Sequence, residues 1–269
     1  MKFFFSEYLN NYSTYTFSYA VYCLKDNDEE TSLIYEKGFL PFSAKISFEK
    51  DIFYLTRSIR IALANFTDTS ENRRVNKIIN NLDKIEFTIT PKENFAINNQ
   101  DFLNFCLTFA KERFTGGNMK KERLNYLLSR KNLTHIITFK SSTKIYGYVF
   151  SCISGGMIHY WFAFYDTNFI SFSLGKWIMW KTISIAKELG MEYVYLGTCF
   201  GQKGLYKVRD HKGTEFFDGI GWNSDLKLLK KLCERDVSDN PQADLFKLED
   251  DISAKIFTDI SNSPPKSPL

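Results

Sequence analysis

The most constraining feature of the chain is a helical pattern enclosed by two apolar, strand-like segments. Between residues 174 and 189 the apolar side chains recur at the spacing of one helix face. Ser173 precedes this stretch and can cap a helix start with its hydroxyl, and Gly190 follows it where a left-handed residue can end the helix. The segment Tyr193–Leu196 is too short and too apolar for a helix, so we expect a buried strand there.

Three further strand patterns precede the helix. Thr134–Phe139 is short and β-branched, Ile145–Cys152 is rich in Tyr, Val and Phe, and Ile158–Tyr165 is strongly aromatic. A Ser-Gly-Gly turn at residues 154–156 joins the last two as a hairpin. Three antiparallel strands, a right-handed crossover helix and a parallel strand are the core order of the GNAT acyltransferase fold. We therefore predict an α+β protein with a GNAT fold and an N-terminal α/β lobe.

The pattern divides the chain into three expected parts. Residues 1–95 form the N-terminal lobe, with strand patterns near Thr14–Cys23, at 57–66 and at Lys84–Thr90. Residues 96–236 form the GNAT-like catalytic domain, which adds helix patterns at 101–114, 121–128 and 225–234. Residues 237–269 form a tail with a weak helix pattern at 245–260 and a proline-rich end that we expect to be disordered.

Composition excludes several classes of protein. The chain has 269 residues and a net charge of +4, a mildly basic balance that is compatible with a polyanionic partner. None of its five cysteines forms a C-x-x-C pair, and an odd count without a signal-peptide pattern favours the cytoplasm. No apolar run approaches the ~20 residues of a membrane span, so we expect no membrane partner.

Motifs for metals and cofactors are missing from the sequence. The three histidines, His135, His159 and His211, have no metal-ligand spacing, and no nucleotide or hydrolase motif occurs. A coenzyme A site would need a glycine-rich loop at the start of the long helix, because its backbone N–H groups hold the pyrophosphate. Only Gly175 is present there, and Trp177 stands in place of the second small residue. We expect no cofactor.

Short motifs along the chain resemble the aminoacyl-tRNA–protein transferases, a family that includes arginyl-tRNA–protein transferase and the bacterial aspartate/glutamate leucyltransferase. The order and spacing of the motifs carry this resemblance over residues 6–225. The C-terminal motifs are Phe164-Tyr165-Asp166, Ser173-Leu174-Gly175, Tyr193-Val194-Tyr195-Leu196-Gly197, Lys203-Gly204-Leu205-Tyr206-Lys207 and Trp222. The N-terminal motifs are Ser6-Glu7-Tyr8-Leu9, Gly38-Phe39, Arg60 to Phe66 and Ser70 to Val75.

Four departures mark a divergent member. Ser6 replaces a leading cysteine, and the family's cysteine cluster is missing from residues 50–56, so we expect no zinc or iron–sulfur site. Phe172 stands where the family has an arginine, and Thr198 replaces an aromatic residue.

The resemblance implies transfer of an aminoacyl group from aminoacyl-tRNA to the N-terminal amine of an acceptor protein. An acidic acceptor N-terminus, and hence N-degron tagging, is the expected case. Two alternatives stay open. One is a GNAT acyltransferase that uses another acyl donor, and the other is a catalytically silent relative that binds tRNA or peptides.

Residue roles follow from the resemblance and from side-chain chemistry. Asp166 is the candidate that orients or deprotonates the amine, with a helix-capping role as its alternative, and Tyr206 is the candidate proton donor or base-stacking platform. The remaining candidates bind substrate. The helix N-terminus is presented by Ser173, Leu174 and Gly175. The candidates to bind tRNA phosphates are Lys203 and Lys207, with Lys176, Arg209 and Lys212. The candidates to bind an acidic side chain of the acceptor are Arg60, Arg73, Arg74 and Lys77.

Overall fold

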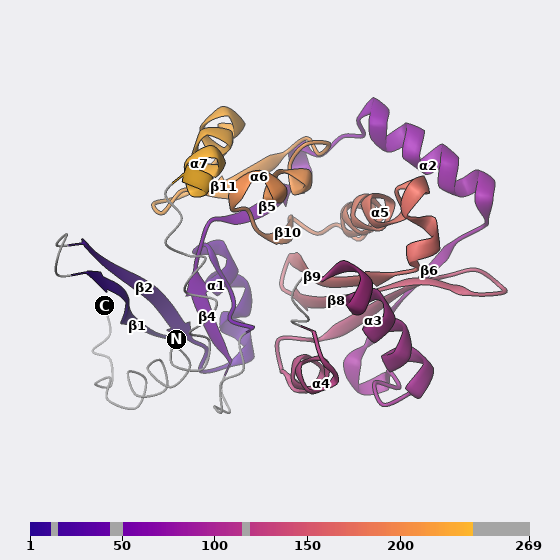
Figure 1. The fold of residues 1–269 in the computed structure, drawn as a ribbon, viewed down its shortest axis with the longest axis horizontal. Coiled ribbons are helices and arrows are strands. Elements are labelled where there is room, and N and C mark those ends of the chain that lie inside the picture. Colours follow the sequence, from indigo (N-terminus) through magenta and orange to yellow (C-terminus); the bar gives the residue numbers. More distant parts are fainter. Residues whose placement is uncertain (12–15, 44–50, 115–118, 239–269) are drawn as a thin grey trace. The chain divides into compact units, whose positions relative to one another are not determined.

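The computed structural model describes residues 1–11, 16–43, 51–114 and 119–238 (Figure 1). Two compact units are built from interleaved segments of the chain. Unit 1 contains residues 1–58, 198–205 and the chain from 216 onward, and unit 2 contains residues 59–197 and 206–215. The boundary expected near residue 95 lies inside unit 2, and the expected tail from residue 239 onward, with its weak helix, lies outside the described residues.

Unit 1 contains a four-stranded antiparallel sheet in the order β1-β2-β4-β3. Two family-like motifs are structural here. Gly38 has φ of 84° and lies against the ring of Phe217 with no room for a β-carbon, and the indole of Trp222 donates to the carbonyl of Glu36 at 2.7 Å. The elements of this part are β1 (Lys2–Asn11), β2 (Thr16–Leu24), α1 (Thr31–Glu36), β3 (Phe39–Pro41), β4 (Ile52–Leu55), α6 (Gly201–Gly204), β12 (Trp222–Asn223) and α7 (Leu226–Ser238).

The larger sheet has the strand order β12-β11-β5-β10-β9-β8-β7-β6. Strands β7 to β9 form the antiparallel meander that the sequence predicted, and β10 joins β9 in parallel after the crossover helix α5. Strand β6, which was expected in the N-terminal lobe, pairs with β7 and extends this meander. The bounds are β5 (Ser58–Ala62), β6 (Glu86–Pro91), β7 (His135–Lys140), β8 (Ile145–Ser154), β9 (Met157–Tyr165), β10 (Tyr193–Thr198) and β11 (Thr214–Phe217).

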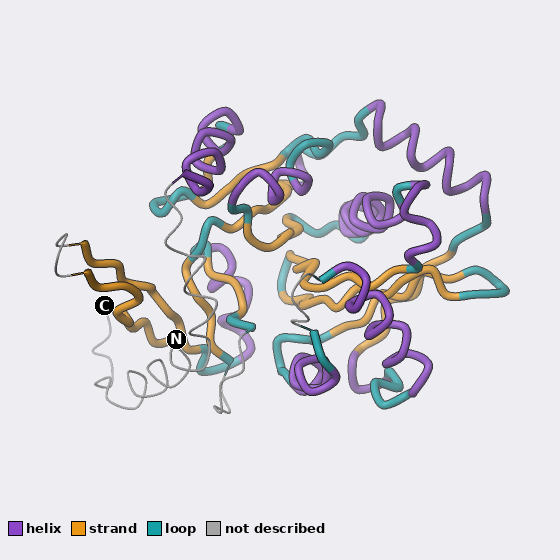
Figure 2. Tube along the Cα trace, viewed as in Figure 1, coloured by secondary structure: helices purple, strands orange, loops and turns teal. Residues whose placement is uncertain are grey.

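Helices cover both faces of the meander in unit 2 (Figures 1 and 2). On one face, α3 (Gln100–Arg113) and α4 (Lys121–Ser129) enclose a core that includes Phe102, Leu124 and Phe150. On the other face lie α5 (Leu174–Glu188) and α2 (Ser70–Leu82), and Trp177 of α5 packs against Phe139 of β7. This layered arrangement leaves the ends of the central strands to form the site.

The end of helix α5 agrees with the sequence analysis, and its start does not. Thr69 caps α2 by accepting from the N–H of Asn72, and Gly190 adopts φ of 73° just beyond α5. The expected cap by Ser173 is wrong, because its side chain makes no capping hydrogen bond and its φ is 64°. The 3₁₀ turns at residues 167–172 run directly into α5, and the N–H of Ser173 donates to Ile170. Among the described helices, none combines the length and apolar composition required to cross a bilayer.

Strands β9 and β10 are paired along only part of their length. The parallel pairs run from Tyr193 with Met157 to Tyr195 with His159, although β9 continues to Tyr165 and β10 to Thr198. A bulge in β9 at Trp161 interrupts its register with β8. The two strands therefore separate beyond residue 195, and an opening forms between them.

Candidate functional site

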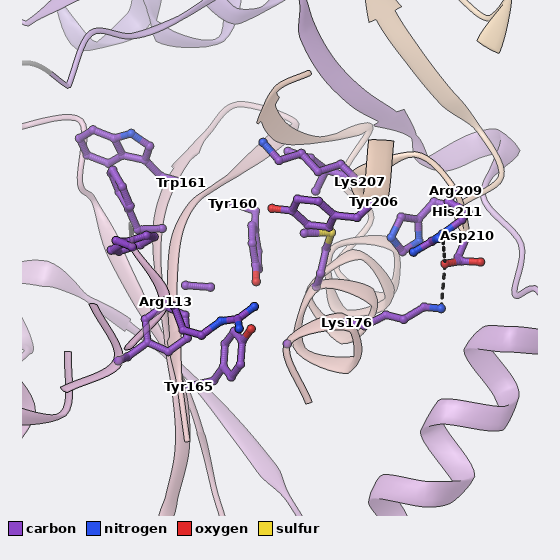
Figure 3. A pocket seen from close by; sticks show the side chains of 17 residues that line it. Arg113, Tyr160, Trp161, Tyr165, Lys176, Tyr206, Lys207, Arg209, Asp210 and His211 are labelled. Carbon is purple, nitrogen blue, oxygen red and sulfur yellow. Dashed lines mark ion pairs between the residues drawn. The ribbon is translucent and has the colours of Figure 1, made fainter. Parts of the chain in front are cut away.

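A cavity of about 510 Å³ in unit 2 opens between the separated parts of β9 and β10 (Figure 3). Tyr160 and Trp161 come from β9, Leu196 from β10, and Gly175 from the start of α5. The other lining residues come from α3 and its end, from β9 and α5, and from the segment after β10: Phe109, Arg113, Phe114, Phe162, Ala163, Tyr165, Lys176, Met179, Tyr206, Lys207, Arg209, Asp210 and His211.

One wall of the cavity is aromatic. In a regular strand alternate residues face opposite sides, yet residues 160–163 all contribute to the lining. The bulge at Trp161 accounts for part of this, because one extra residue places two neighbouring side chains on the same face of the strand. Tyr165 and Phe109 extend the wall, with ring centroids 4.5 Å apart. Such a surface suits an apolar group or a nucleobase.

A chain of ion pairs borders the cavity at the start of α5. The ammonium of Lys176 lies 2.8 Å from Glu71 and 2.7 Å from Asp210. Arg74 also pairs with Glu71 at 2.7 Å, and Arg209 lies 3.7 Å from Asp210. Hydrogen bonds from Arg74 and then Lys176 lower the pKa of Glu71 from 4.5 to about 2. Lys176 is therefore already neutralised by two carboxylates.

Lys207 reaches the point where the two strands separate. Gly197 at the end of β10 has φ of 86°, and a β-carbon there would lie 3.3 Å from the Lys207 ammonium. On the neighbouring strand, burial and then the Lys207 charge lower the pKa of His159 to about 3. The ammonium thus lies inside the opening and beside a neutral imidazole.

Three tyrosines line the same cavity. Burial raises the pKa of Tyr160 well above its usual value, and the nearby Tyr206 and Tyr165 raise it further. Tyr160 therefore stays protonated and can donate a hydrogen bond. Tyr206 is 54% exposed, and an exposed aromatic ring is a surface on which a nucleobase can stack.

The start of α5 differs from the arrangement that the sequence suggested. Trp177 is buried, and its indole donates to Asn76 at 2.9 Å, so it does not occupy the place of a phosphate. The ring of Tyr165 lies over Gly175 instead. Leu174 is fully buried, so this residue presents its backbone and not its side chain.

Asp166 is not among the residues that line the cavity. One carboxylate oxygen accepts from the N–H of Asn168 at 3.0 Å, which caps the 3₁₀ turns, and the other lies 3.2 Å from the ammonium of Lys144. These contacts match the capping alternative. Of the predicted catalytic pair, only Tyr206 lies at the cavity.

Most of the predicted cationic residues lie elsewhere. Arg60 is buried, pairs with Glu215 at 2.7 Å and stacks 4.0 Å above the ring of Tyr193. Arg73 donates to the carbonyl of Asp68, and Arg74 pairs with Glu71. Lys77 and Lys212 are exposed and outside the lining, and Lys203 belongs to unit 1.

Several lining residues were missed by the sequence analysis. Arg113 ends α3, Trp161 forms the bulge, and His211 follows the last cationic motif. The aromatic run at residues 160–162 was the available signal, but a regular strand would have buried every second ring. Among the described residues, no group of three or more His, Cys, Asp or Glu side chains is arranged to hold a metal ion.

A family profile described as "Acetyltransferase (GNAT) domain" matches residues 122–212. This range includes the meander from β7 to β9, the crossover helix and the separated strands. Unit 2 has the GNAT fold. The aspartate/glutamate leucyltransferases of Campylobacter jejuni strains 81-176 and RM1221 are each 34% identical to this chain over 76 residues. The match spans 28% of this chain and 28% of each relative, so the resemblance to aminoacyl-tRNA–protein transferases is confirmed over a limited region.

Solved structures with a similar course of the chain were also found. One is a C-terminal domain assigned to lysylphosphatidylglycerol synthetase in Agrobacterium fabrum, with TM-score 0.38, 11% identity and coverage of 63% of this chain and 51% of that one. Another is L-PGS from Bacillus licheniformis, with TM-score 0.38, 16% identity and coverage of 64% and 50%. The names of the matched family and of the leucyltransferases support acyl transfer in general terms.

Proposed function

We propose that the protein transfers an aminoacyl group from aminoacyl-tRNA to the N-terminal amine of an acceptor protein. The cavity between β9 and β10 is the main support, because Gly175, Tyr206 and Lys207 of the family-like motifs all line it. The similarity to enzymes named aspartate/glutamate leucyltransferase adds to this support. Such a transfer would tag the acceptor as an N-degron substrate.

The reaction requires the amine and the ester to be positioned correctly more than it requires strong acid–base catalysis. The amine nitrogen forms a bond to the ester carbonyl carbon, and the bond from that carbon to the tRNA 3′ oxygen breaks. The amine proton ends on the departing hydroxyl. Because an ester is already activated, the main tasks are alignment and stabilisation of a transient oxyanion.

Lys207 is the residue suited to stabilise that oxyanion, because its ammonium lies where the two strands separate. The protonated phenol of Tyr160 lines the same cavity, and Figure 3 shows its hydroxyl directed away from the Lys207 ammonium. Charged donors in a site screened from water stabilise developing charge more strongly than water does. Tyr206, with its exposed ring, suits stacking against the terminal base of the tRNA.

Arg113 is the best candidate partner for an acidic acceptor residue. It lies at the cavity, it is exposed, and its guanidinium makes no ion pair with any described residue. Arg60 and Arg74, by contrast, already pair with carboxylates. A guanidinium fork can bind a carboxylate through two parallel hydrogen bonds, which favours an N-terminal Asp or Glu.

The direct test supplies the protein with individually charged, radiolabelled tRNAs and with peptides that begin with Asp, Glu, Arg or Ala. The proposal expects label on the peptide with one charged tRNA and preference for an acidic first residue. Acetyl-CoA serves as the competing donor, because the matched profile describes acetyltransferases. Acetyl transfer without aminoacyl transfer would replace the proposal with a coenzyme A reaction, and binding of charged tRNA without any transfer would indicate a silent relative.

A further inference from the structure

His211 is a buried side chain with an unused hydrogen-bonding capacity. It lines the cavity, and its side chain is only 6% exposed. Its Nδ1 atom is buried without a hydrogen-bond partner among the described residues. Figure 3 shows the ring between Tyr206 and Asp210. A buried nitrogen without a partner is destabilising, and in native proteins such a group meets an ordered water, a ligand or a reacting group.

The surroundings of His211 keep its ring neutral. Burial lowers the pKa of His211 to about 4, Asp210 opposes this shift, and Lys176 adds to it. The charged lining residues on this side of the cavity are Lys176, Lys207, Arg209 and Asp210, and both Lys176 and Arg209 pair with Asp210. A neutral imidazole can accept one hydrogen bond and donate another.

We propose that the imidazole of His211 holds the attacking amine of the acyl acceptor by accepting a hydrogen bond from its N–H. This inference rests on the proposed aminoacyl transfer. It identifies the part of the same cavity that binds the attacking amine. A carboxylate in this position would favour the protonated ammonium, which cannot attack a carbonyl. Burial disfavours positive charge on an amine for the same reason that it disfavours it on the imidazole, while Asp210 acts in the opposite direction.

The step leaves His211 chemically unchanged. The amine lone pair forms the new C–N bond while one N–H remains directed at the imidazole. The ester C–O bond then breaks, and the proton released by the amine is carried to the departing tRNA hydroxyl. His211 therefore binds and aligns the nucleophile, and it is not required to store the proton.

The test measures peptide binding apart from transfer. A short peptide beginning with Glu and its N-acetylated form are titrated by calorimetry into the full chain, into His211→Leu and into His211→Gln. The inference expects the free amine to bind the wild type more tightly, and His211→Leu to lose this preference by about 3- to 10-fold, the range for one hydrogen bond. Gln retains an acceptor and should recover part of the preference. His135→Leu, at a histidine outside the cavity lining, is the matched control.

The melting temperature is a second measurement, because replacing a purely structural histidine would lower it. Because leucine removes the unpaired nitrogen, the melting temperature of His211→Leu should be unchanged or higher. Equal binding of the two peptides by the wild type, or an unaltered preference in His211→Leu, overturns the inference. If His211→Leu unfolds, the folded His211→Gln replaces it: a preference for the free amine that is weaker than in the wild type but still present supports the inference, and an unaltered preference overturns it. Failure of every charged tRNA as a donor counts against the proposed function alone, because the binding preference is measured without tRNA.

Discussion

The ring of Tyr165 lies directly over Gly175, so closely that a β-carbon on residue 175 would approach the ring carbon Cζ to 2.5 Å. The glycine therefore sets the position of an aromatic cavity wall against the start of α5. Sequence reasoning assigned this glycine to backbone hydrogen bonding, and the close approach of the ring adds a second reason for it.

Gly175→Ala is expected to reduce transfer and to destabilise the protein by about 1–3 kcal/mol, since overpacking forces the ring to move. A double-mutant cycle with Tyr165→Leu measures this contact, because the added methyl meets no ring in the double variant. The melting temperature of all four proteins provides the coupling energy. Additive effects would indicate that the ring does not depend on the glycine.

Glu71→Gln is expected to lower stability at neutral pH by no more than about 1 kcal/mol, because the pairs with Arg74 and Lys176 are partly exposed. The folded-state pKa of about 2 lies below the usual 4.5, so the stabilisation is present above pH 4.5 and is lost as pH falls toward 2. Thermal melts across this range should therefore converge for the two proteins. A constant difference at every pH would assign the effect to packing.

Substitutions of Lys207 and Lys203 are expected to change different measured quantities, the first kcat and the second the affinity for tRNA. Lys207→Gln is expected to lower kcat by about 10²- to 10³-fold if its ammonium stabilises the oxyanion. Lys203→Gln should instead weaken tRNA binding and reduce the salt dependence of the affinity by about one unit of slope, as for one phosphate contact. Lys230→Gln, at an exposed residue of α7, is the control. An effect of Lys207→Gln confined to tRNA affinity would return Lys207 to the phosphate-binding role.

Asp166→Ala is expected to act on stability and not on transfer. The carboxylate caps the turns before α5 and pairs with Lys144, so its loss should cost about 0.5–2 kcal/mol. Asp166→Asn keeps a good cap and should recover most of that loss. Transfer by both variants, measured well below their melting temperatures, should stay near wild type. A large fall in kcat for a fully folded Asp166→Asn would restore the catalytic role that the sequence suggested.

Ser173→Gly is expected to raise stability by up to about 1 kcal/mol, because glycine tolerates the left-handed conformation that Ser173 adopts at φ of 64°. Ser173→Ala should leave stability close to wild type, since the serine hydroxyl makes no capping hydrogen bond. Denaturant unfolding of the three proteins distinguishes these outcomes. A clear loss in the alanine variant would show that the hydroxyl stabilises the helix start.

The order of elements around the site could be predicted from the sequence because each element carries a local signal. The period-3.6 pattern after Ser173 became α5, and the aromatic and β-branched runs became β7 to β10 with the predicted directions. Gly190 ended the helix for a reason that lies in its own backbone. Gly175, Tyr206 and Lys207 of the family-like motifs line one cavity.

Tertiary contacts determined which residues form the site, and these contacts leave no local signal in the sequence. Asp166 and Arg60 look like free charges in the sequence, but Lys144 and Glu215, distant in the chain, pair with them. His211 looks unremarkable until burial removes its access to water and leaves Nδ1 without a partner. Local propensity thus determined which segments are helices and strands. Long-range packing alone decided which charges are neutralised and which polar groups stay available to a substrate, because both depend on neighbours that only the folded chain brings together.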